Sequence, residues 1–272
     1  VFRNTELIYN NETGTRISRL GFKGTIIDGV DRVLVSQGPH HLFEHPEGSL
    51  KLLTRDYRLS DDISFRFASN ATTLSAPQYV NWLSAIPADE NIVTLGMDYE
   101  TFGEHHKRET GILAFLESLL SELAQRKDVH FRTAAEAMEE TTARKLSVPN
   151  FISWADQERD LSAWLGNDMQ RDAFDSLLKA EQDVKRLHDK ALLRQWRALQ
   201  TSDHFYYMST KKGSDGEVHN YFSPYPSPYE AFINYMNVLT DLTLRLKVAK
   251  SAEIIRVPEM VSALSTDLRI PV

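Results

Sequence analysis

The chain has 272 residues, 42% of them hydrophobic and 25% charged, and a net charge of -7 at pH 7, a composition typical of a soluble globular protein with one large or two smaller domains. The acidic balance and the scattered Lys and Arg residues argue against a nucleic-acid partner, and no apolar run approaches the ~20 residues that span a membrane. The absence of cysteine excludes disulfides and thiolate metal sites and fits a reducing compartment, so we predict a cytoplasmic location.

Strands and helices are predicted to alternate over the first half of the chain. Residues 1–9 are β-prone and contain Glu6. Residues 11–20 are predicted to form a helix that Gly21 ends, and residues 23–28 return to strand.

The segment at residues 38–48 has a loop composition and holds three histidines, His40, His41 and His45. Three histidines this close suggest a zinc site, but they lack the fixed ligand spacing with a helical pair that such sites use. We therefore favour surface or cleft histidines and predict no metal site.

After this loop, the segment at residues 55–67 carries Asp61 and Asp62 and then a predicted half-buried strand from Ile63 to Phe67, where the apolar side chains alternate. Asp61 and Asp62 precede that strand instead of following it. Capping or salt bridging is therefore favoured for them over catalysis.

Helices are also predicted at residues 77–86, 110–126 and 133–140, and a short strand at residues 129–131. The helix at 110–126 carries the clearest amphipathic stripe. The alternation up to about residue 146 predicts a parallel α/β layout.

The segment at residues 91–106 is where an apolar run meets acids, aromatics and histidines. The run from Ile92 to Met97 is predicted to be a buried strand of a parallel sheet. Asp98 and Glu100 follow at once, and catalytic side chains of such folds collect at the carboxyl ends of strands. The alternative is that Asp98 only caps the turn while Glu100 is solvated.

The composition changes at residues 147–152, which are predicted to be a connector. Residues 167–200 and 229–249 have a helical pattern and predict a small antiparallel bundle. Residues 201–228 between them are predicted to be a long aromatic loop, and such loops usually bind something. Sugars are a natural candidate because their apolar faces stack on aromatic rings. Packing onto the first domain is the alternative for part of these aromatics.

Three segments resemble motifs of the α-amylase-like glycoside hydrolases of family 57: VFRNTELIYN at residues 1–10, MDYETFGEH at 97–105 and TSDHFYYM at 201–208. The resemblance spans nearly the whole chain, includes ISWADQERDLSAWLG at 152–166, and keeps the motifs in the family's order. It implies the C-terminal part of an incomplete (β/α)7 barrel over residues 1–150, followed by an α-helical bundle over residues 151–272.

By motif, Glu6 falls on the family's catalytic nucleophile and Asp98 on its general acid/base. The resemblance implies retaining cleavage of α-1,4 linkages in α-glucans such as starch, glycogen and maltooligosaccharides, without a cofactor. That mechanism needs the two carboxylates ~5 Å apart. The side chains expected to bind sugar are Asp203, His204, Trp154, Tyr99 and His105.

The chain departs from the family's pattern at its start. The opening motif, a histidine-containing segment that binds sugar, is absent, because the chain starts at the third motif. We therefore expect a partial chain without the first barrel strands, poorly soluble or inactive when expressed alone. Both catalytic positions are filled, which favours an enzyme over a degenerate family member.

Three alternatives stay open. The first is a 4-α-glucanotransferase or branching-type transglycosylase of the same family. The second is a metal-dependent polysaccharide deacetylase that uses Asp98 and histidines around a divalent ion. The third is a non-catalytic glucan-binding or regulatory protein, which would tolerate loss of Glu6.

Overall fold

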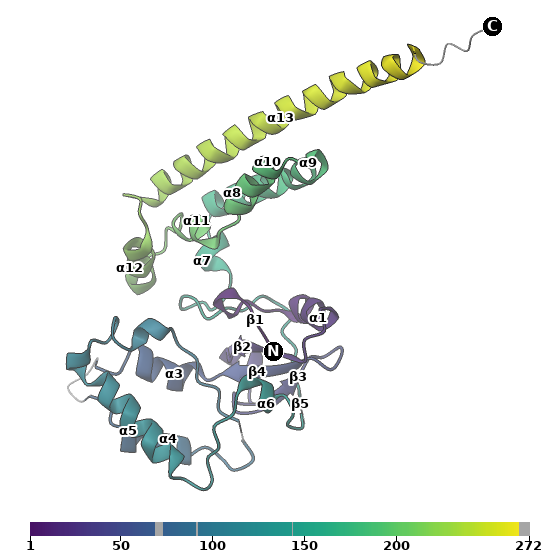
Figure 1. The fold of residues 1–272 in the computed structure, drawn as a ribbon. Helices are drawn as coiled ribbons and strands as arrows, with labels where there is room; N and C mark the ends of the chain where they lie inside the picture. The colour runs from purple at the N-terminus through teal and green to yellow at the C-terminus, as the bar shows by residue number, and fades with distance from the viewer. Residues whose placement is uncertain (69–72, 91, 143, 267–272) are drawn as a thin grey trace. The chain divides into compact units, whose positions relative to one another are not determined.

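The computed structural model describes residues 1–68, 73–90, 92–142 and 144–266, with side chains up to residue 252. The chain divides into two compact units, Val1–Ala155 and Asp156–Val272 (Figure 1). The candidate residues are therefore divided as well. The first unit holds Glu6, Asp98, Tyr99, His105 and Trp154, and the second holds Asp203 and His204.

The first unit is built on five strands, β1 (Phe2–Arg3), β2 (Gly24–Asp28), β3 (Leu42–Glu44), β4 (Lys51–Arg55) and β5 (Arg144–Lys145). They form one mixed sheet in the order β1-β2-β4-β3-β5. Strands β1, β2 and β4 run parallel, β3 is antiparallel to β4, and β5 is parallel to β3. The predicted α/β class is confirmed, and the three parallel strands end at one edge of the sheet.

The helices of the first unit are α1 (Asn11–Arg19), α2 (Asp31–Leu34), α3 (Tyr57–Ser64), α4 (Ala76–Ser84), α5 (Ile112–Ala124) and α6 (Ala134–Ala137), with 3-10 turns η1 (Thr5–Leu7), η2 (Tyr99–Thr101) and η3 (Arg108–Thr110). Helix α1 begins where the Asn10 side chain accepts a hydrogen bond from Thr13 N at 2.8 Å. Gly21, with φ 86, follows its end. Both boundaries are those that the sequence predicts.

Two large apolar cores and a smaller cluster of Leu42, Leu53, Ala137 and Met138 hold the described part of the first unit together. One packs the sheet against α1, α2 and the segment after β5, and the other packs α3, α4 and α5 together. The connector predicted at residues 147–152 belongs to the first core, because Val148 and Ile152 are fully buried there. The segment is therefore a packed part of the first unit.

Three predicted elements of the first unit outside residues 92–97 are wrong. The strand predicted from Ile63 to Phe67 does not form, because helix α3 at residues 57–64 takes its first two residues; the Asp56 side chain caps this helix by accepting from Leu59 N at 2.9 Å. Ile63 is buried on that helix, whereas Phe65 is 67% exposed. The strand predicted at residues 129–131 has no strand pairing in the structure, and the loop at 38–48 contains β3.

The second unit is helical throughout its described part. Its helices are α7 (Ser162–Leu165), α8 (Asp168–Lys179), α9 (Glu181–Leu187), α10 (Lys190–Ala198), α11 (Ser202–Tyr206), α12 (Gly213–Phe222) and α13 (Pro228–Thr266). The predicted aromatic loop at residues 201–228 is therefore wrong, since α11 and α12 occupy most of it. Its aromatics divide between Phe205, which is buried, and Tyr221 and Phe222, which are exposed.

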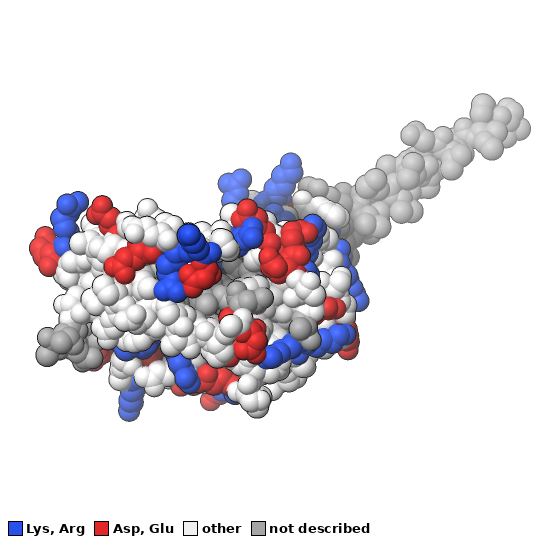
Figure 2. Space-filling view, turned by 90° about the horizontal axis from the view of Figure 1, so that it is seen from below, with Lys and Arg blue, Asp and Glu red and all other residues white. Residues whose placement is uncertain are grey.

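The surface and the helices also bear on partners. In the part of the chain that the structure describes, no helix combines the length and apolar character that a membrane span needs. On the face shown in Figure 2, Lys and Arg side chains alternate with Asp and Glu over the described residues. On this face the two signs of charge are therefore interspersed.

Candidate functional site

Glu6 lies just after the carboxyl end of β1, in the turn η1. Its backbone is left-handed, with φ 52, and Leu7 follows with φ 51. Each left-handed non-glycine residue costs on the order of 1–3 kcal/mol and persists only where the surrounding structure holds it. The Asn4 side chain closes the turn by donating to Ile8 O at 2.8 Å. Strain that neighbouring bonds maintain is concentrated at functional sites.

Trp154 holds Glu6 through both its backbone and its side chain. Its indole Nε1 donates to Glu6 Oε2 at 2.8 Å, and its backbone N donates to Glu6 O at 3.1 Å. Ser153 Oγ also donates to Glu6 O, at 2.9 Å. An antiparallel bridge between Tyr9 and Ile152 brings these two distant segments together. Long-range pairing therefore fixes the orientation of the Glu6 carboxylate.

Arg55 lies at the same edge of the sheet, at the end of β4, and is 3% exposed. Its Nη1 donates to Asp28 Oδ1 at 3.0 Å and its Nη2 to Asp61 Oδ1 at 2.6 Å. Asp28 is the last residue of β2, and the β2–β4 register places it beside Arg55. The expectation that Asp61 forms a salt bridge is confirmed. The guanidinium lies 5.3 Å from the centre of the Trp154 ring, within cation–π range.

The segment before Asp98 is not the buried strand that the sequence predicts. Thr94 forms one parallel bridge with Arg55, and Val93 and Leu95 are 37% and 36% exposed. Side chains take the place of a strand partner. Arg55 Nε donates to Gly96 O, and Gly96 N donates to Ser60 Oγ at 3.2 Å. The segment still leaves the carboxyl end of β4, so Asp98 follows the same sheet edge as Glu6.

Asp98 precedes the turn η2 and is exposed, without a capping hydrogen bond from its side chain. The alternative role for Asp98, capping of this turn, is thus not seen. Tyr99 is 91% exposed and His105 is exposed as well. These side chains are accessible for contact with a ligand.

The remaining two candidates lie on α11 in the second unit. Asp203 is exposed, and the half-buried His204 ring packs 5.5 Å from the ring of Tyr235. Burial and the negative charge of Asp203 raise the pKa of Tyr207 one turn later. Asp203 and His204 thus border an aromatic cluster on this helix.

The three histidines at residues 40–45 are buried, so the expectation of surface or cleft histidines is wrong. Each has its own partners. His40 lies between Asp56 and Glu90, His41 Nε2 is 2.8 Å from Arg144 Nη1, and His45 Nε2 is 2.9 Å from Asn11 O. Their hydrogen bonds satisfy separate parts of the fold and do not converge on one point.

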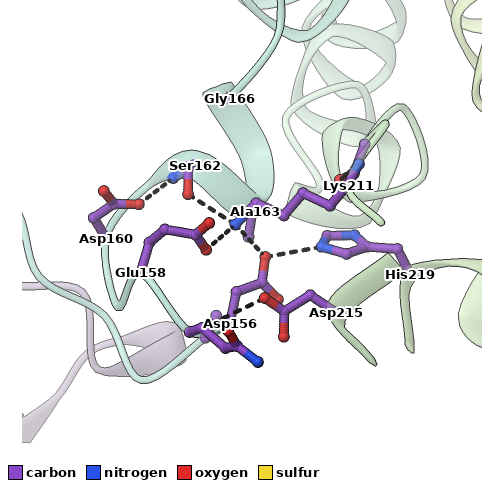
Figure 3. Close-up of polar contacts among 12 residues, drawn as sticks. Asp156, Glu158, Asp160, Ser162, Ala163, Gly166, Lys211, Asp215 and His219 are labelled. Carbon is purple, nitrogen blue, oxygen red and sulfur yellow. Dashed lines mark hydrogen bonds and ion pairs between the residues drawn. The ribbon is translucent and has the colours of Figure 1, made fainter. Parts of the chain in front are cut away.

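One group of acids in the described residues has the spacing of metal ligands, namely Asp156, Glu158 and Asp215 in the second unit (Figure 3). The Lys211 ammonium already lies among them, 2.7 Å from Asp156 and 2.5 Å from Glu158. Burial alone lowers the pKa of Lys211, but its hydrogen bonds to these two acids outweigh burial and raise it. The cation that balances this group is therefore a lysine of the chain itself.

His219 completes this second-unit network. Its Nε2 is 3.0 Å from Asp156 Oδ2, and its ring stacks on Tyr206 with the centroids 3.7 Å apart. Tyr206 is the last residue of α11, the helix that carries Asp203 and His204. The network thus connects the segment after Trp154 to the motif at residues 201–208 within the second unit.

Sequence reasoning missed Arg55 and Asp28. Asp28 had a usable signal, since it ends a predicted strand as Asp98 does. Arg55 had none, because its role depends on the strand register.

Two surface hollows lie away from these residues: one of about 600 Å3 along α1, and one between α4 and α5.

Comparison with known proteins identifies the family. The model of glycosyl hydrolase family 57 matches residues 1–152. A Methanocaldococcus jannaschii protein provisionally named an alpha-amylase is 42% identical over 267 residues, covering 92% of this chain and 56% of that protein. The chain thus spans about half the length of this relative.

Solved structures share the fold. An alpha-amylase from Thermotoga maritima aligns with a TM-score of 0.57 at 12% identity, over 93% of this chain and 62% of that one. A family 57 branching enzyme from Thermococcus kodakaraensis, solved in complex with glucose, aligns with a TM-score of 0.61 at 14% identity, over 86% and 54%. The predicted family is confirmed: the chain belongs to glycosyl hydrolase family 57.

Proposed function

We propose that this chain carries the reacting carboxylates of a retaining glycoside hydrolase that cleaves α-1,4 linkages in α-glucans, with Glu6 as nucleophile and Asp98 as general acid/base. The observation that carries the proposal is the placement of Glu6. It follows a parallel strand, sits on a left-handed turn, and its carboxylate accepts the Trp154 indole N–H at 2.8 Å. Family membership supports the class of reaction.

The reaction takes place in two displacements. In the first, a Glu6 oxygen attacks the anomeric carbon while Asp98 gives its proton to the departing glycosidic oxygen, which leaves a glycosyl ester on Glu6. In the second, Asp98 takes a proton from water, and the water oxygen attacks the same carbon and releases Glu6. Trp154 holds one Glu6 oxygen in place throughout.

The other candidate residues bind the sugar in this proposal. Tyr99 offers an exposed ring face, and His105 follows it on the same segment. Asp203 and His204 accept and donate hydrogen bonds to sugar hydroxyls from α11. The first unit corresponds to part of the family's incomplete (β/α)7 barrel and the second to its helical bundle.

The acceptor in the second displacement separates a hydrolase from a glucanotransferase or branching enzyme of the same family. Water gives shorter maltooligosaccharides, whereas a sugar hydroxyl gives products longer than the donor. Chromatography of the products formed from a single maltooligosaccharide measures the ratio of the two.

The test replaces each reacting carboxylate by its amide in the complete protein. Glu6→Gln and Asp98→Asn each delete a reacting group with little change in shape, so kcat on maltooligosaccharides should fall by about 10³-fold or more while the thermal midpoint stays near the wild-type value. Glu12→Gln and Asp168→Asn make the same changes at exposed ion pairs and serve as matched controls.

Rescue of a Glu6 variant by azide tests directly whether Glu6 is the nucleophile. In Glu6→Ala, azide should enter from the side that Glu6 vacates and restore turnover, giving a glycosyl azide of inverted configuration. Wild-type turnover in Glu6→Gln would contradict the nucleophile assignment. Chelator-sensitive release of acetate from an acetylated polysaccharide would instead favour the deacetylase alternative, and glucan binding by a chain without turnover would favour the binding protein.

A further inference from the structure

In the described part of the first unit, Arg55 contacts two structures that hold the proposed reacting carboxylates. One is the segment that leads to Asp98, and the other is the Trp154 indole that bonds to Glu6. We propose that Arg55 is a positioning residue that sets the geometry of Glu6 and Asp98 together, an inference that rests on the proposed function. Its N–H groups fix the segment that leads to Asp98, and its guanidinium face supports the indole that holds Glu6.

The link to Asp98 is through the backbone. Arg55 Nε donates to the carbonyl of Gly96, two residues before Asp98. Two further bonds hold the same segment, since Gly96 N donates to Ser60 Oγ at 3.2 Å and Asp56 N donates to Thr94 O at 2.9 Å. The side chain of Arg55 thus replaces the strand pairing that this segment lacks after Thr94.

The link to Glu6 is through Trp154. The guanidinium carbon of Arg55 lies 5.3 Å from the centre of the indole ring, and the indole Nε1 lies 2.8 Å from Glu6 Oε2. Movement of the indole would therefore move a hydrogen-bond donor to that Glu6 oxygen. Arg3 also lies over this ring, at 5.1 Å, but is exposed.

The guanidinium itself is held rigidly. Asp28 Oδ1 and Asp61 Oδ1 accept from its two terminal nitrogens at 3.0 and 2.6 Å, and the Arg55 and Asp28 side chains are 4% and 0% exposed. A planar fork spreads these bonds and the Nε bond over three nitrogens, whereas a lysine ammonium has one nitrogen and cannot reproduce their geometry. The register of β2 and β4 therefore fixes the position of Arg55, and Arg55 in turn positions both carboxylates.

The first experiment compares Arg55→Lys with Arg58→Lys in the complete protein. Arg58 lies on α3, bonds to the exposed Asp31, and makes a matched control for the same chemical change. Displacement of reacting groups by about 1 Å costs up to 10²-fold in rate. We expect Arg55→Lys to lower kcat by about 10–100-fold with KM nearly unchanged, and Arg58→Lys to change neither.

A double-mutant cycle tests the route through the indole. Trp154→Phe keeps a ring beneath the guanidinium but removes the N–H donor. If Arg55 acts through Trp154, the rate losses of Arg55→Lys and Trp154→Phe are less than additive in the double variant. Fully additive losses would overturn this route. Should Arg55→Lys fail to fold, Asp61→Asn loosens the guanidinium instead, and an unchanged kcat in that variant would overturn the proposal.

A spectroscopic measurement separates this inference from the proposed function, because it needs no turnover. The indole N–H resonance of Trp154, assigned by its disappearance in Trp154→Phe, should shift in Arg55→Lys and in Glu6→Gln but not in Arg58→Lys. An unshifted resonance in Arg55→Lys would refute the positioning role. A shifted resonance in a protein whose Glu6→Gln variant retains activity would refute the proposed function alone.

Discussion

Residues with a left-handed backbone lie in different surroundings in this protein. Among the described residues, Glu6, Leu7, Asp156 and Arg159 have positive φ beside the polar networks of the two units, whereas His188 has φ 52 at the exposed end of α9. Glycine adopts this conformation without the steric cost that a β-carbon brings. His188 is thus a left-handed residue that can change without touching the candidate site.

His188→Gly should stabilise the protein. The change removes the strain at the C-terminus of α9, so the free energy of unfolding should rise by about 0.5–1 kcal/mol. Chemical denaturation at neutral pH measures it. Lys190→Gly, two residues later in the first turn of α10, is the matched control and should lower stability, because glycine weakens a helix. A loss of stability in His188→Gly would contradict this account.

At the scale of elements, His40 joins the loop before β3 to two segments that flank the candidate site. It bonds through Nε2 to Asp56, the cap of α3, at 2.7 Å, and through Nδ1 to Glu90 at 2.8 Å. Burial alone lowers the pKa of His40, but the hydrogen bonds to Asp56 and Glu90 outweigh burial and raise it. Burial likewise acts to raise the pKa of Asp56, and its hydrogen bonds from His40 and Leu59 N outweigh that effect and lower it.

These shifts predict how stability depends on pH. The raised pKa of His40 gives stability that is fully present below its unfolded value of about 6.5 and is lost as pH rises through the folded value. The lowered pKa of Asp56 gives stability that is present above about pH 3.9 and is lost as pH falls through its folded value. The pair therefore stabilises most between these two limits.

Urea denaturation of wild type and His40→Gln at mildly acidic and mildly alkaline pH checks this. The stability difference between the two proteins should shrink on the alkaline side, where wild-type His40 loses its proton. His130→Gln, at an exposed histidine, should show no such trend. A difference that stays constant with pH would mean that His40 is not charged in the folded protein.

At the scale of the whole molecule, the sequence predicted the elements that carry their own local signals. Helix α1 has its Asn10 cap and Gly21, and α5 has its apolar stripe. Residues 63–67 and 92–97 were assigned wrongly because a short apolar run fits a helix, a strand or an extended segment equally well. The choice was made by Asp56, Ser60 and Arg55, whose bonds to these segments do not appear in local periodicity.

The candidate site divides in the same way. Glu6, Asp98 and Trp154 could be named as candidates because motifs point to residues one at a time. Arg55 could not be found, because its importance arises from the register that pairs it with Asp28 across β2 and β4. A pair such as Arg55 and Asp28 can be recognised only when the strand pairing of the sheet is known.

The two-carboxylate mechanism predicts that metal removal leaves turnover unchanged. The metal-like acidic group of the second unit already holds the Lys211 ammonium, and the proposed chemistry uses no ion. Turnover on maltooligosaccharides and the thermal midpoint should therefore be unchanged after dialysis against a chelator. Loss of turnover that added Zn2+ restores would contradict the mechanism and favour metal-dependent chemistry.

The bond between Trp154 and Glu6 also has a consequence in time. The two residues are separated by 148 positions in the chain. At a synthesis rate of ~5–20 residues per second, the ribosome needs roughly 7–30 s after making Glu6 before Trp154 exists. During that interval the strained turn has no indole to hold its carboxylate, so the nascent chain passes through most of its first unit before its proposed nucleophile can be oriented.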